Sequence, residues 1–254
     1  MTTAAAQPDY GIDAPGVMRN LFLAGAACLV LGLFGPMHLH LAGYDFQVRW
    51  SFLYPAASFL LGGVLFLVYV KVGKFRHRDF MLDLRRWTGA ERVLDVGCGR
   101  GLLLAGAAKR IAALDGSGHV TGIDIWSNVD MGGNSEAATR ANLALEGIAA
   151  RCTLISEAAQ DMTFADGSFE VVVSNLCLHN IGDRATRERA LAQIARVLAP
   201  GGIALISDFR NTGEYARAFR AAGLDVETRR GSFVTTFPPL TVVIARKPRY
   251  GADA

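Results

Sequence analysis

The feature that most constrains this chain is the stretch VLDVGCGRG at residues 93–101. A short apolar run contains an acid, Asp95, and three glycines then follow at alternate positions. Residues 102–113 have the apolar spacing of a helix. The pattern predicts a strand, a tight turn and the start of a helix. Glycine lets the backbone of such a turn adopt conformations closed to other residues and approach a ligand closely.

From residue 89 onward, predicted strands alternate with predicted helices. This alternation predicts a doubly wound α/β fold whose mostly parallel sheet binds its ligand at the carboxyl ends of the strands. The run Val171-Val172-Val173 is apolar on both faces, which is typical of a central parallel strand. Strands are expected at 92–96, 119–124, 152–156, 169–175 and 203–208, with a closing pair near 225–230 and 240–246. Helices are expected at 102–113, 135–147, 184–198 and 212–222.

The glycine spacing and two acids narrow the class of ligand. The third glycine comes two residues after the second, whereas the dinucleotide fingerprint places it three residues after. Asp95 suits a cationic ligand better than one that carries phosphates. Asp124 ends the next predicted strand, where it can accept hydrogen bonds from both hydroxyls of a ribose. The set favours a sulfonium nucleoside over the nicotinamide dinucleotide of an oxidoreductase.

Four segments, in order, resemble motifs of the class I S-adenosylmethionine-dependent methyltransferases. They are VLDVGCGRG, GIDIW at 122–126, FADGSFEVVVSNLCLHNI at 164–181 and RVLAPGGIALISDF at 196–209. The resemblance covers residues 89–246 and is strongest to small-molecule and lipid methyltransferases, including those of ubiquinone and menaquinone synthesis. It implies a Rossmann-like methyltransferase sheet, with S-adenosylmethionine as cofactor and S-adenosylhomocysteine as product.

The resemblance also implies roles for particular residues. Asp95 and the backbone of the glycine turn would meet the methionine part of the cofactor. Asp124 would hold the ribose hydroxyls, with Ile125 or Trp126 against the adenine. The full set of cofactor-binding residues implied is Asp95, Gly97, Cys98, Gly99, Asp124, Ile125, Trp126, Ala158, Ala159 and Asn175.

One position departs from the family pattern. The family usually has an acid that pairs with the adenine amino group, and that position is Ala158 here. Glu157 lies one residue before it and Asp161 three residues after it. The backbone at Ala159 could still pair with the adenine edge, so the side chain that does so stays open. The segment 127–134 is longer than usual and is either a lid over the cofactor or a connector.

The reaction centre of the family follows the fourth strand, here at residues 175–180. The sequence lacks the Asn/Asp-Pro-Pro-Tyr motif that supports methylation of a planar amino nitrogen, and it lacks an acidic cluster for metal-assisted chemistry. We therefore expect O- or C-methylation and no metal. His179 is the candidate catalytic base because its ordinary pKa lies near working pH; alternatively, it lines the pocket or caps the next helix. Cys177 has no base assigned to it and is expected to form pocket wall.

Two apolar stretches precede this domain, at 17–36 and 52–72. Each has about the length that a membrane-spanning helix needs. Small residues four apart, at Ala24, Cys28 and Gly32, suit close packing of two helices in lipid. The sequence predicts a transmembrane helical hairpin over 17–72, after a mobile tail at 1–16. The alternatives are two core helices of a soluble protein, or a cleaved signal peptide over the first stretch.

Flanking charges predict the orientation of the hairpin. Six basic residues lie at or beyond the end of the second stretch: Lys71, Lys74, Arg76, Arg78, Arg85 and Arg86. The loop between the stretches offers only Arg49. Because positive residues stay on the cytoplasmic side, we expect both termini and the catalytic domain in the cytoplasm, at the inner membrane. His38 and His40 in the loop have no carboxylate close by in the sequence, so we do not interpret them as a metal site.

The remaining boundaries follow from these segments. Residues 73–88 are expected to form a basic connector helix, which lies along the lipid headgroups or packs on the sheet as the first helix of the domain; the two are compatible. The methyltransferase domain is expected at 89–248, followed by a C-terminal tail at 249–254. The four cysteines are scattered and favour a reducing compartment.

These features together predict an integral membrane methyltransferase with a lipophilic small molecule or a lipid as substrate, because a soluble substrate would not require the anchor. The alternative is a membrane-tethered domain that binds the cofactor without turnover and acts through partners. The net charge of +3 is too small and too localised for a nucleic-acid-binding surface. A homo-oligomer is compatible with the sequence.

Overall fold

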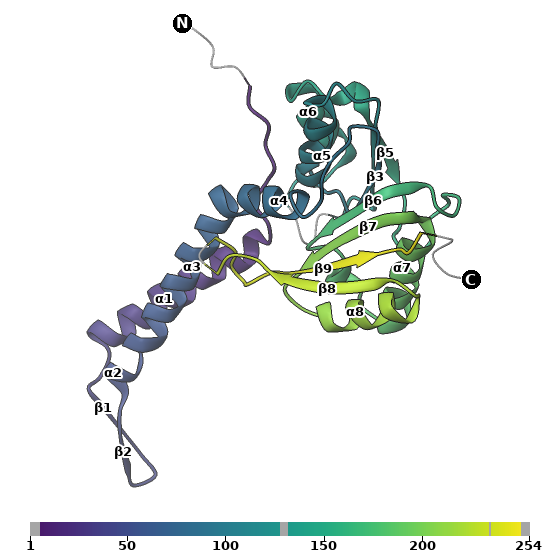
Figure 1. Ribbon diagram of the computed structural model, residues 1–254. Coiled ribbons are helices and arrows are strands. Elements are labelled where there is room, and N and C mark those ends of the chain that lie inside the picture. Colours follow the sequence, from purple (N-terminus) through teal and green to yellow (C-terminus); the bar gives the residue numbers. More distant parts are fainter. Residues whose placement is uncertain (1–5, 128–131, 234, 250–254) are drawn as a thin grey trace, which may run out of the picture.

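The computed structural model describes residues 6–127, 132–233 and 235–249. A helical hairpin projects from an α/β domain (Figure 1). The first arm is α1 (Pro15–Phe34). The second is one continuous helix, Val48–Leu82, which comprises α2 (Val48–Ser51), α3 (Leu53–Val68), the π-helical turn η1 (Tyr69–Gly73) and α4 (Lys74–Leu82). The predicted span at 52–72 and most of the predicted connector helix therefore form a single rod.

The domain is built on a seven-stranded sheet with the order β5-β4-β3-β6-β7-β9-β8. Its strands are β3 (Arg92–Val96), β4 (His119–Asp124), β5 (Cys152–Ser156), β6 (Phe169–Asn175), β7 (Leu198–Asp208), β8 (Asp225–Arg230) and β9 (Thr241–Arg246). β9 runs antiparallel to both of its neighbours, β7 and β8, and the other neighbouring strands of this sheet are parallel. The predicted doubly wound, mostly parallel sheet is confirmed. β7 begins five residues earlier than predicted because Leu198 already pairs with Phe169.

Helices cover both faces of the sheet. The helices of the domain are α5 (Leu102–Ala112), α6 (Glu136–Leu145), α7 (Arg184–Val197) and α8 (Thr212–Ala221), with short turns η2 (Ala149–Arg151) and η3 (Leu178–Asn180). α4 and α5 pack on one face through a cluster that includes Leu82, Leu104 and Val171. α7 and α8 pack on the other face through a cluster that includes Leu191 and Phe219. The carboxyl ends of β3, β4, β6 and β7 therefore lie between two well-packed layers.

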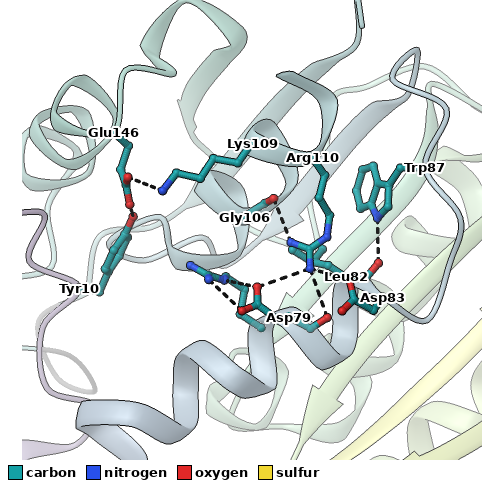
Figure 2. A network of polar contacts seen from close by, with 10 residues as sticks. Tyr10, Asp79, Leu82, Asp83, Trp87, Gly106, Lys109, Arg110 and Glu146 are labelled. Carbon is teal, nitrogen blue, oxygen red and sulfur yellow. Dashed lines mark hydrogen bonds and ion pairs between the residues drawn. The ribbon is translucent and has the colours of Figure 1, made fainter. Parts of the chain in front are cut away.

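α4 packs on the domain, which is one of the two arrangements expected for the connector helix. Leu82 is fully buried. Arg110 of α5 donates to Asp83 at 2.7 Å, and the indole of Trp87 donates to the Leu82 carbonyl at 2.8 Å (Figure 2). A methyl group at Gly106 would lie 2.7 Å from Cδ of Arg78, so glycine allows the two helices to approach closely. The long helix is thus packed closely against the α/β domain.

The expectation of a mobile tail over residues 1–16 is wrong for residues 6–14. Tyr10 is buried, and its hydroxyl donates to Glu146 at 2.6 Å (Figure 2). Lys74 is also buried, and its ammonium donates to the carbonyls of Tyr10 at 2.9 Å and Gly11 at 2.6 Å. Contacts with distant residues, rather than local secondary structure, hold this segment in place. For this reason its sequence shows no helical or strand periodicity.

The two arms of the hairpin pack through glycines. Methyl groups placed on Gly25 and Gly32 of α1 would lie 2.7 Å from Leu60 and 2.5 Å from Leu53 of α3. Most other apolar side chains of α1 face outward, and Phe34 at its end is 81% exposed. Only 11% of the apolar window of α1 is buried. A core helix of a soluble protein would be mostly buried, so this exposure is unlike that alternative.

The connection between the arms is a small hairpin of β1 (His38–Leu41) and β2 (Tyr44–Gln47). Its register brings the Asp45 carboxylate to 2.9 Å from His38 and 3.3 Å from His40. The expectation that no carboxylate lies near these histidines is therefore wrong, because a turn of two residues folds Asp45 back onto them. Across the ranges given above, no three His, Cys, Asp or Glu side chains are arranged to hold a metal ion.

Candidate functional site

The glycine turn lies at the carboxyl end of β3 and uses its own amides to hold its shape. The amides of Gly97 and Cys98 donate to the Ile123 carbonyl at 2.8 and 3.0 Å. The amide of Gly99 donates to a carboxylate oxygen of Asp124 at 2.8 Å. Because these donors are used within the protein, a ligand at the turn meets mainly acceptors, namely carbonyl and carboxylate oxygens. Acceptors suit an ammonium or sulfonium group.

Glycine is required at the first position of the turn. Gly97 has a φ of +70°, and a methyl group there would lie 2.1 Å from Sγ of Cys177. Burial raises the pKa of Cys177 to about 12, so its thiol stays protonated and forms wall beneath the turn. The side chain of Cys98 is buried against Gly122. Cys98 was predicted to bind the cofactor, and it can therefore contact a ligand only through its backbone.

Asp95 is the best evidence that the site fits its expected cofactor. Its side chain is 1% exposed, and its Oδ2 is buried without a hydrogen-bond partner. Burial, with the nearby charge of Asp124, raises the pKa of Asp95 to about 8. A buried acceptor without a donor is costly, and the ammonium group of a methionine moiety would remove that cost.

Asp124 is positioned by two backbone amides at the carboxyl end of β4. One oxygen accepts from Gly99, as above, and the other accepts from the amide of Trp126 at 2.6 Å. The second oxygen also accepts from the side-chain amide of Asn134 at 3.3 Å. A carboxylate has about four acceptor positions, so one remains open for a ribose hydroxyl, and a second hydroxyl would replace the long contact with Asn134. Ile125 is 68% exposed and leaves an apolar face open, whereas the indole of Trp126 is tied to Ser156 at 2.7 Å.

The segment after β5 offers no carboxylate at the adenine position. Ala158 occupies that position, and its carbonyl accepts from the amide of Asp161 at 3.1 Å. Glu157 turns back, so that its Oε1 accepts from the amide of Thr163 at 2.8 Å. This leaves the backbone around Ala159 as the nearest partner for an adenine edge. Of the segment expected to be either lid or connector, residues 128–131 lie outside the described residues.

His179 lies in η3, after β6, and is paired with an acid that the sequence reasoning missed. Its Nδ1 lies at an ion-pair distance of 2.9 Å from Oδ1 of Asp208, the last residue of β7, without hydrogen-bond geometry. Its backbone amide donates to Oδ2 of the same carboxylate at 3.2 Å. Asp208 is buried and also accepts from the hydroxyl of Tyr215 at 3.1 Å. The cap of α7 is Asp183, so His179 does not cap that helix. The sequence did contain a signal for this pair, because Asp208 ends the predicted strand that lies next to β6 in the sheet.

The long helix also contributes to this end of the sheet. Tyr69 is 2% exposed, and its hydroxyl lies beside the Asn175 side chain at the end of β6. Neither that hydroxyl nor Oδ1 of Asn175 has a hydrogen-bond partner. Asn175 was predicted as a cofactor-binding residue, but Tyr69 was not predicted at all. Its position depends on how the helix docks, which no local pattern encodes.

The N-terminal segment crosses the glycine turn. Asp9 forms an ion pair with Arg100 at 3.0 Å. The amide of Asn142 donates to the carbonyls of both Asp9 and Arg100, at 2.8 and 2.9 Å. The segment therefore covers the side of the turn that faces α6. This contact was also missed, because the segment was expected to be free.

Comparisons with known proteins indicate the class of protein. Residues 94–206 match a family described as a methyltransferase domain. An uncharacterized methyltransferase of Mycobacterium tuberculosis is 34% identical over 134 residues, which are 52% of this chain and 58% of that protein. A ubiquinone/menaquinone biosynthesis C-methyltransferase of Vibrio campbellii is 31% identical over 132 residues, 52% of this chain and 46% of that protein. The chain thus spans about half the length of these relatives.

Solved structures share the fold at low sequence identity. A [4+2]-cyclase, SpnF, has a TM-score of 0.57 at 19% identity, over 94% of this chain and 99% of its own. An N-methyltransferase, NodS, of Bradyrhizobium japonicum has a TM-score of 0.56 at 15% identity, over 70% of this chain and 98% of its own.

The family and the methyl donor are those that the sequence predicted. The match over residues 94–206 identifies a methyltransferase domain, and the glycine turn and the sheet order make the chain similar to the class I S-adenosylmethionine-dependent methyltransferases.

Proposed function

We propose that this chain is an integral membrane methyltransferase that methylates a lipophilic or membrane-associated acceptor. The observation that carries this proposal is the continuous helix Val48–Leu82. Its first part is apolar and largely exposed, and its later part sets Tyr69 beside Asn175 at the carboxyl end of β6. An acceptor that follows this helix out of a bilayer would arrive at the reaction centre.

The side of the site that would bind the methyl donor presents hydrogen-bond acceptor atoms. When bound, S-adenosylmethionine supplies an electrophilic methyl group on a sulfonium with a neutral thioether as leaving group. Asp95 would pair with the ammonium group and Asp124 with the ribose hydroxyls. Ile125 would cover one face of the adenine. These contacts orient the methyl group, and orientation is the main contribution that such a reaction needs from the protein.

The acceptor side is formed by His179 and its partners. The backbone amide of His179 donates to Asp208, which sets the imidazole with Nδ1 at an ion-pair distance from that carboxylate and leaves Nε2 to act on the acceptor. The proton of an acceptor hydroxyl or carbon acid would pass to Nε2 as the new bond to the methyl group forms. The ring of Phe209 packs edge-to-face against the imidazole of His179, with 4.7 Å between the ring centroids, and limits its rotation. This arrangement supports O- or C-methylation.

The orientation proposed is that of the sequence prediction, with the domain in the cytoplasm. Arg49, the basic residue of the connection between the helices, donates to the carbonyls of Gly32 at 3.3 Å and of Leu33. It therefore caps the end of α1 and has a structural role at the outer surface. The other basic residues lie on the side of the domain, as the positive-inside rule requires.

A second candidate is a tethered domain that binds the cofactor without transferring its methyl group. The observation that favours it is Ala158, which leaves the adenine position without its usual carboxylate. Weak donor binding would follow from that loss. The two candidates differ in turnover, so a measurement of methyl transfer decides between them.

The test uses the full chain in lipid nanodiscs, with tritium-labelled methyl donor and a total lipid extract as acceptor. The proposal expects label in the organic phase with the wild-type protein and at least a hundredfold less with His179→Ala. Asp166 is exposed and precedes the amino end of β6, opposite the end that carries His179, so Asp166→Asn serves as the matched control. Label that enters only water-soluble products would overturn the lipophilic acceptor. Donor binding without any label would favour the second candidate.

Membrane orientation is tested separately, in intact cells. A cysteine at Leu41, in the exposed connection, should react with an impermeant maleimide added outside, whereas a cysteine at Asp166 should not. The reverse pattern would overturn the orientation, and labelling of both in intact cells would argue against a membrane barrier between them.

A further inference from the structure

A cavity of about 360 Å³ lies between α4 and the segment that follows β8. α4 contributes Arg76, His77 and Phe80, and the other wall contains Arg230, Ser232 and Thr235. The lining has two arginines and no carboxylate. Its volume is in the range of small-ligand sites. None of the residues assigned above to the methyl-transfer site is among the described residues that line this cavity.

The two arginines of the cavity are unpaired. Both are exposed, and within the described chain neither guanidinium forms an ion pair or hydrogen bond. Their sequence neighbours behave differently: Arg78 pairs with Asp79 at 2.9 Å, and Arg229 lies 3.6 Å from Glu227. Two uncompensated guanidinium groups on opposite walls attract an anion, and their planar donors match the oxygens of a phosphate.

His77 adds a buried donor to the same cavity. Its side chain is 3% exposed, and Nε2 lies 2.7 Å from the hydroxyl oxygen of Ser207. Nδ1 is buried without a partner, and a methyl group on Gly231 would lie 3.1 Å from it. When the Ser207 hydroxyl donates to Nε2, Nδ1 carries the proton and points at the glycine wall of the cavity. Burial lowers the pKa of His77 to about 4, so this donor is a neutral N–H.

In the membrane arrangement proposed above, on which this step rests, the cavity lies at the depth of lipid phosphates. Arg76 follows the end of the predicted span, residue 72, by four residues, which is about 6 Å along a helix. The headgroup layer on each side of a bilayer is about 5–8 Å thick. Phe233, next to the cavity wall, is 63% exposed. Exposed Trp, Phe and Leu side chains are typical of protein surfaces that insert at the boundary between headgroups and acyl chains.

We propose that this cavity binds the phosphate group of a phosphate ester. Arg76 and Arg230 supply the charge, and the Nδ1–H of His77 donates from the floor. The ester comes either from a phospholipid headgroup of the inner leaflet or from a soluble phosphate ester, and both present the same anion. A bound headgroup would hold the domain at a defined height on the membrane. The site does not depend on methyl transfer.

The test measures ligand binding to the full chain in a phosphate-free maltoside detergent, by native mass spectrometry. The probes are short-chain phosphatidylglycerol and, in a separate arm, inorganic phosphate. The wild-type protein should bind one phosphatidylglycerol, and the double variant R76Q/R230Q should bind it at least tenfold more weakly. Arg229→Gln, the paired neighbour, is the matched control and should bind as the wild type does.

A second variant keeps both arginines and changes the floor. Gly231→Ala should also weaken binding, because its methyl group would crowd Nδ1 of His77. Unchanged binding of S-adenosylmethionine shows that each variant is folded. Binding of inorganic phosphate without phosphatidylglycerol would support the site and assign it to soluble esters. The proposal fails if neither probe binds, if R76Q/R230Q binds as well as the wild type, or if Arg229→Gln loses as much affinity.

Discussion

Nδ1 of His179 lies 2.9 Å from Oδ1 of Asp208, a carboxylate that is 1% exposed. His179 follows β6, and Asp208 ends β7, the neighbouring parallel strand. The order of strands in the sheet, rather than proximity in the sequence, therefore brings the two residues together. The amide of Phe209 and the hydroxyl of Tyr215 also donate to Asp208. These bonds keep the carboxylate in place beside the imidazole, where it can stabilise the charge that forms when the ring accepts a proton.

Replacement of this carboxylate should reduce methyl transfer with little effect on donor binding. Asp208→Asn keeps the shape but can no longer stabilise the imidazolium, and a positioned base contributes about 10²–10⁴-fold to rate. We expect kcat to fall by about a hundredfold or more, while the dissociation constant of S-adenosylmethionine stays within about twofold. Tyr215→Phe should have a smaller effect of the same kind. Equal kcat values for Asp208→Asn and the wild type would contradict a role for His179 as base.

Asp95 should make donor binding and stability depend on pH in opposite directions. Its pKa of about 8 in the folded protein lies above its ordinary value of 3.8, so the folded state binds this proton more tightly than the unfolded state does. The free energy of unfolding of the ligand-free protein should therefore fall as pH rises from about 4 to 8, by up to a few kcal/mol. Affinity for the cationic donor should rise over the same range, because the ionised carboxylate binds its ammonium group.

The variant Asp95→Asn should remove both effects. It should raise the Tm of the ligand-free protein at pH 7 and weaken donor binding, since the neutral amide costs less to bury and attracts no cation. Thermal unfolding and calorimetric titration across pH measure the two effects. Asp166→Asn, an exposed acid, should leave both pH profiles unchanged. A pH-independent donor affinity in the wild type would contradict this account of Asp95.

Asp124 should determine recognition of the ribose. Each hydrogen bond to a charged group is worth about 1.5–3 kcal/mol, so Asp124→Asn should weaken binding of S-adenosylhomocysteine by about 10–100-fold. The more specific result concerns a 2′-deoxy analogue: the wild type should bind it at least tenfold more weakly than S-adenosylhomocysteine, and Asp124→Asn should discriminate less. Asp161→Asn, the acid near the adenine position, is the control. Full discrimination in Asp124→Asn would mean that other groups hold the ribose.

The helical hairpin should be sensitive to added methyl groups only where the helices touch. A methyl group on Gly25 would lie 2.7 Å from Cγ of Leu60, whereas one on Gly16 has no atom within 4 Å. Overpacking costs about 1–3 kcal/mol, so Gly25→Ala should lower the Tm in detergent. Gly16→Ala should leave it unchanged or raise it slightly, because alanine favours a helix. Equal Tm values for the two variants would contradict the close packing of α1 on α3.

Local pattern was sufficient for most of the α/β domain. The predicted bounds of β3, β4, β5, β6 and β8 coincide with those of the structure, because alternation of apolar runs with glycine and polar turns is a property of short segments. The glycine turn, Asp95 and Asp124 were predictable for the same reason. Each occupies a position that is defined relative to the strand before it.

Contacts between distant segments decided the rest. Tyr10 bonds to Glu146 across 136 residues, and Tyr69 reaches Asn175 only because the long helix docks on the sheet. Asp208 meets His179 because β6 and β7 are neighbours. Such contacts depend on the relative placement of elements, which burial and packing of the whole chain determine. The sequence by itself determined the sheet and its cofactor, whereas tertiary structure decided which side chains face the acceptor.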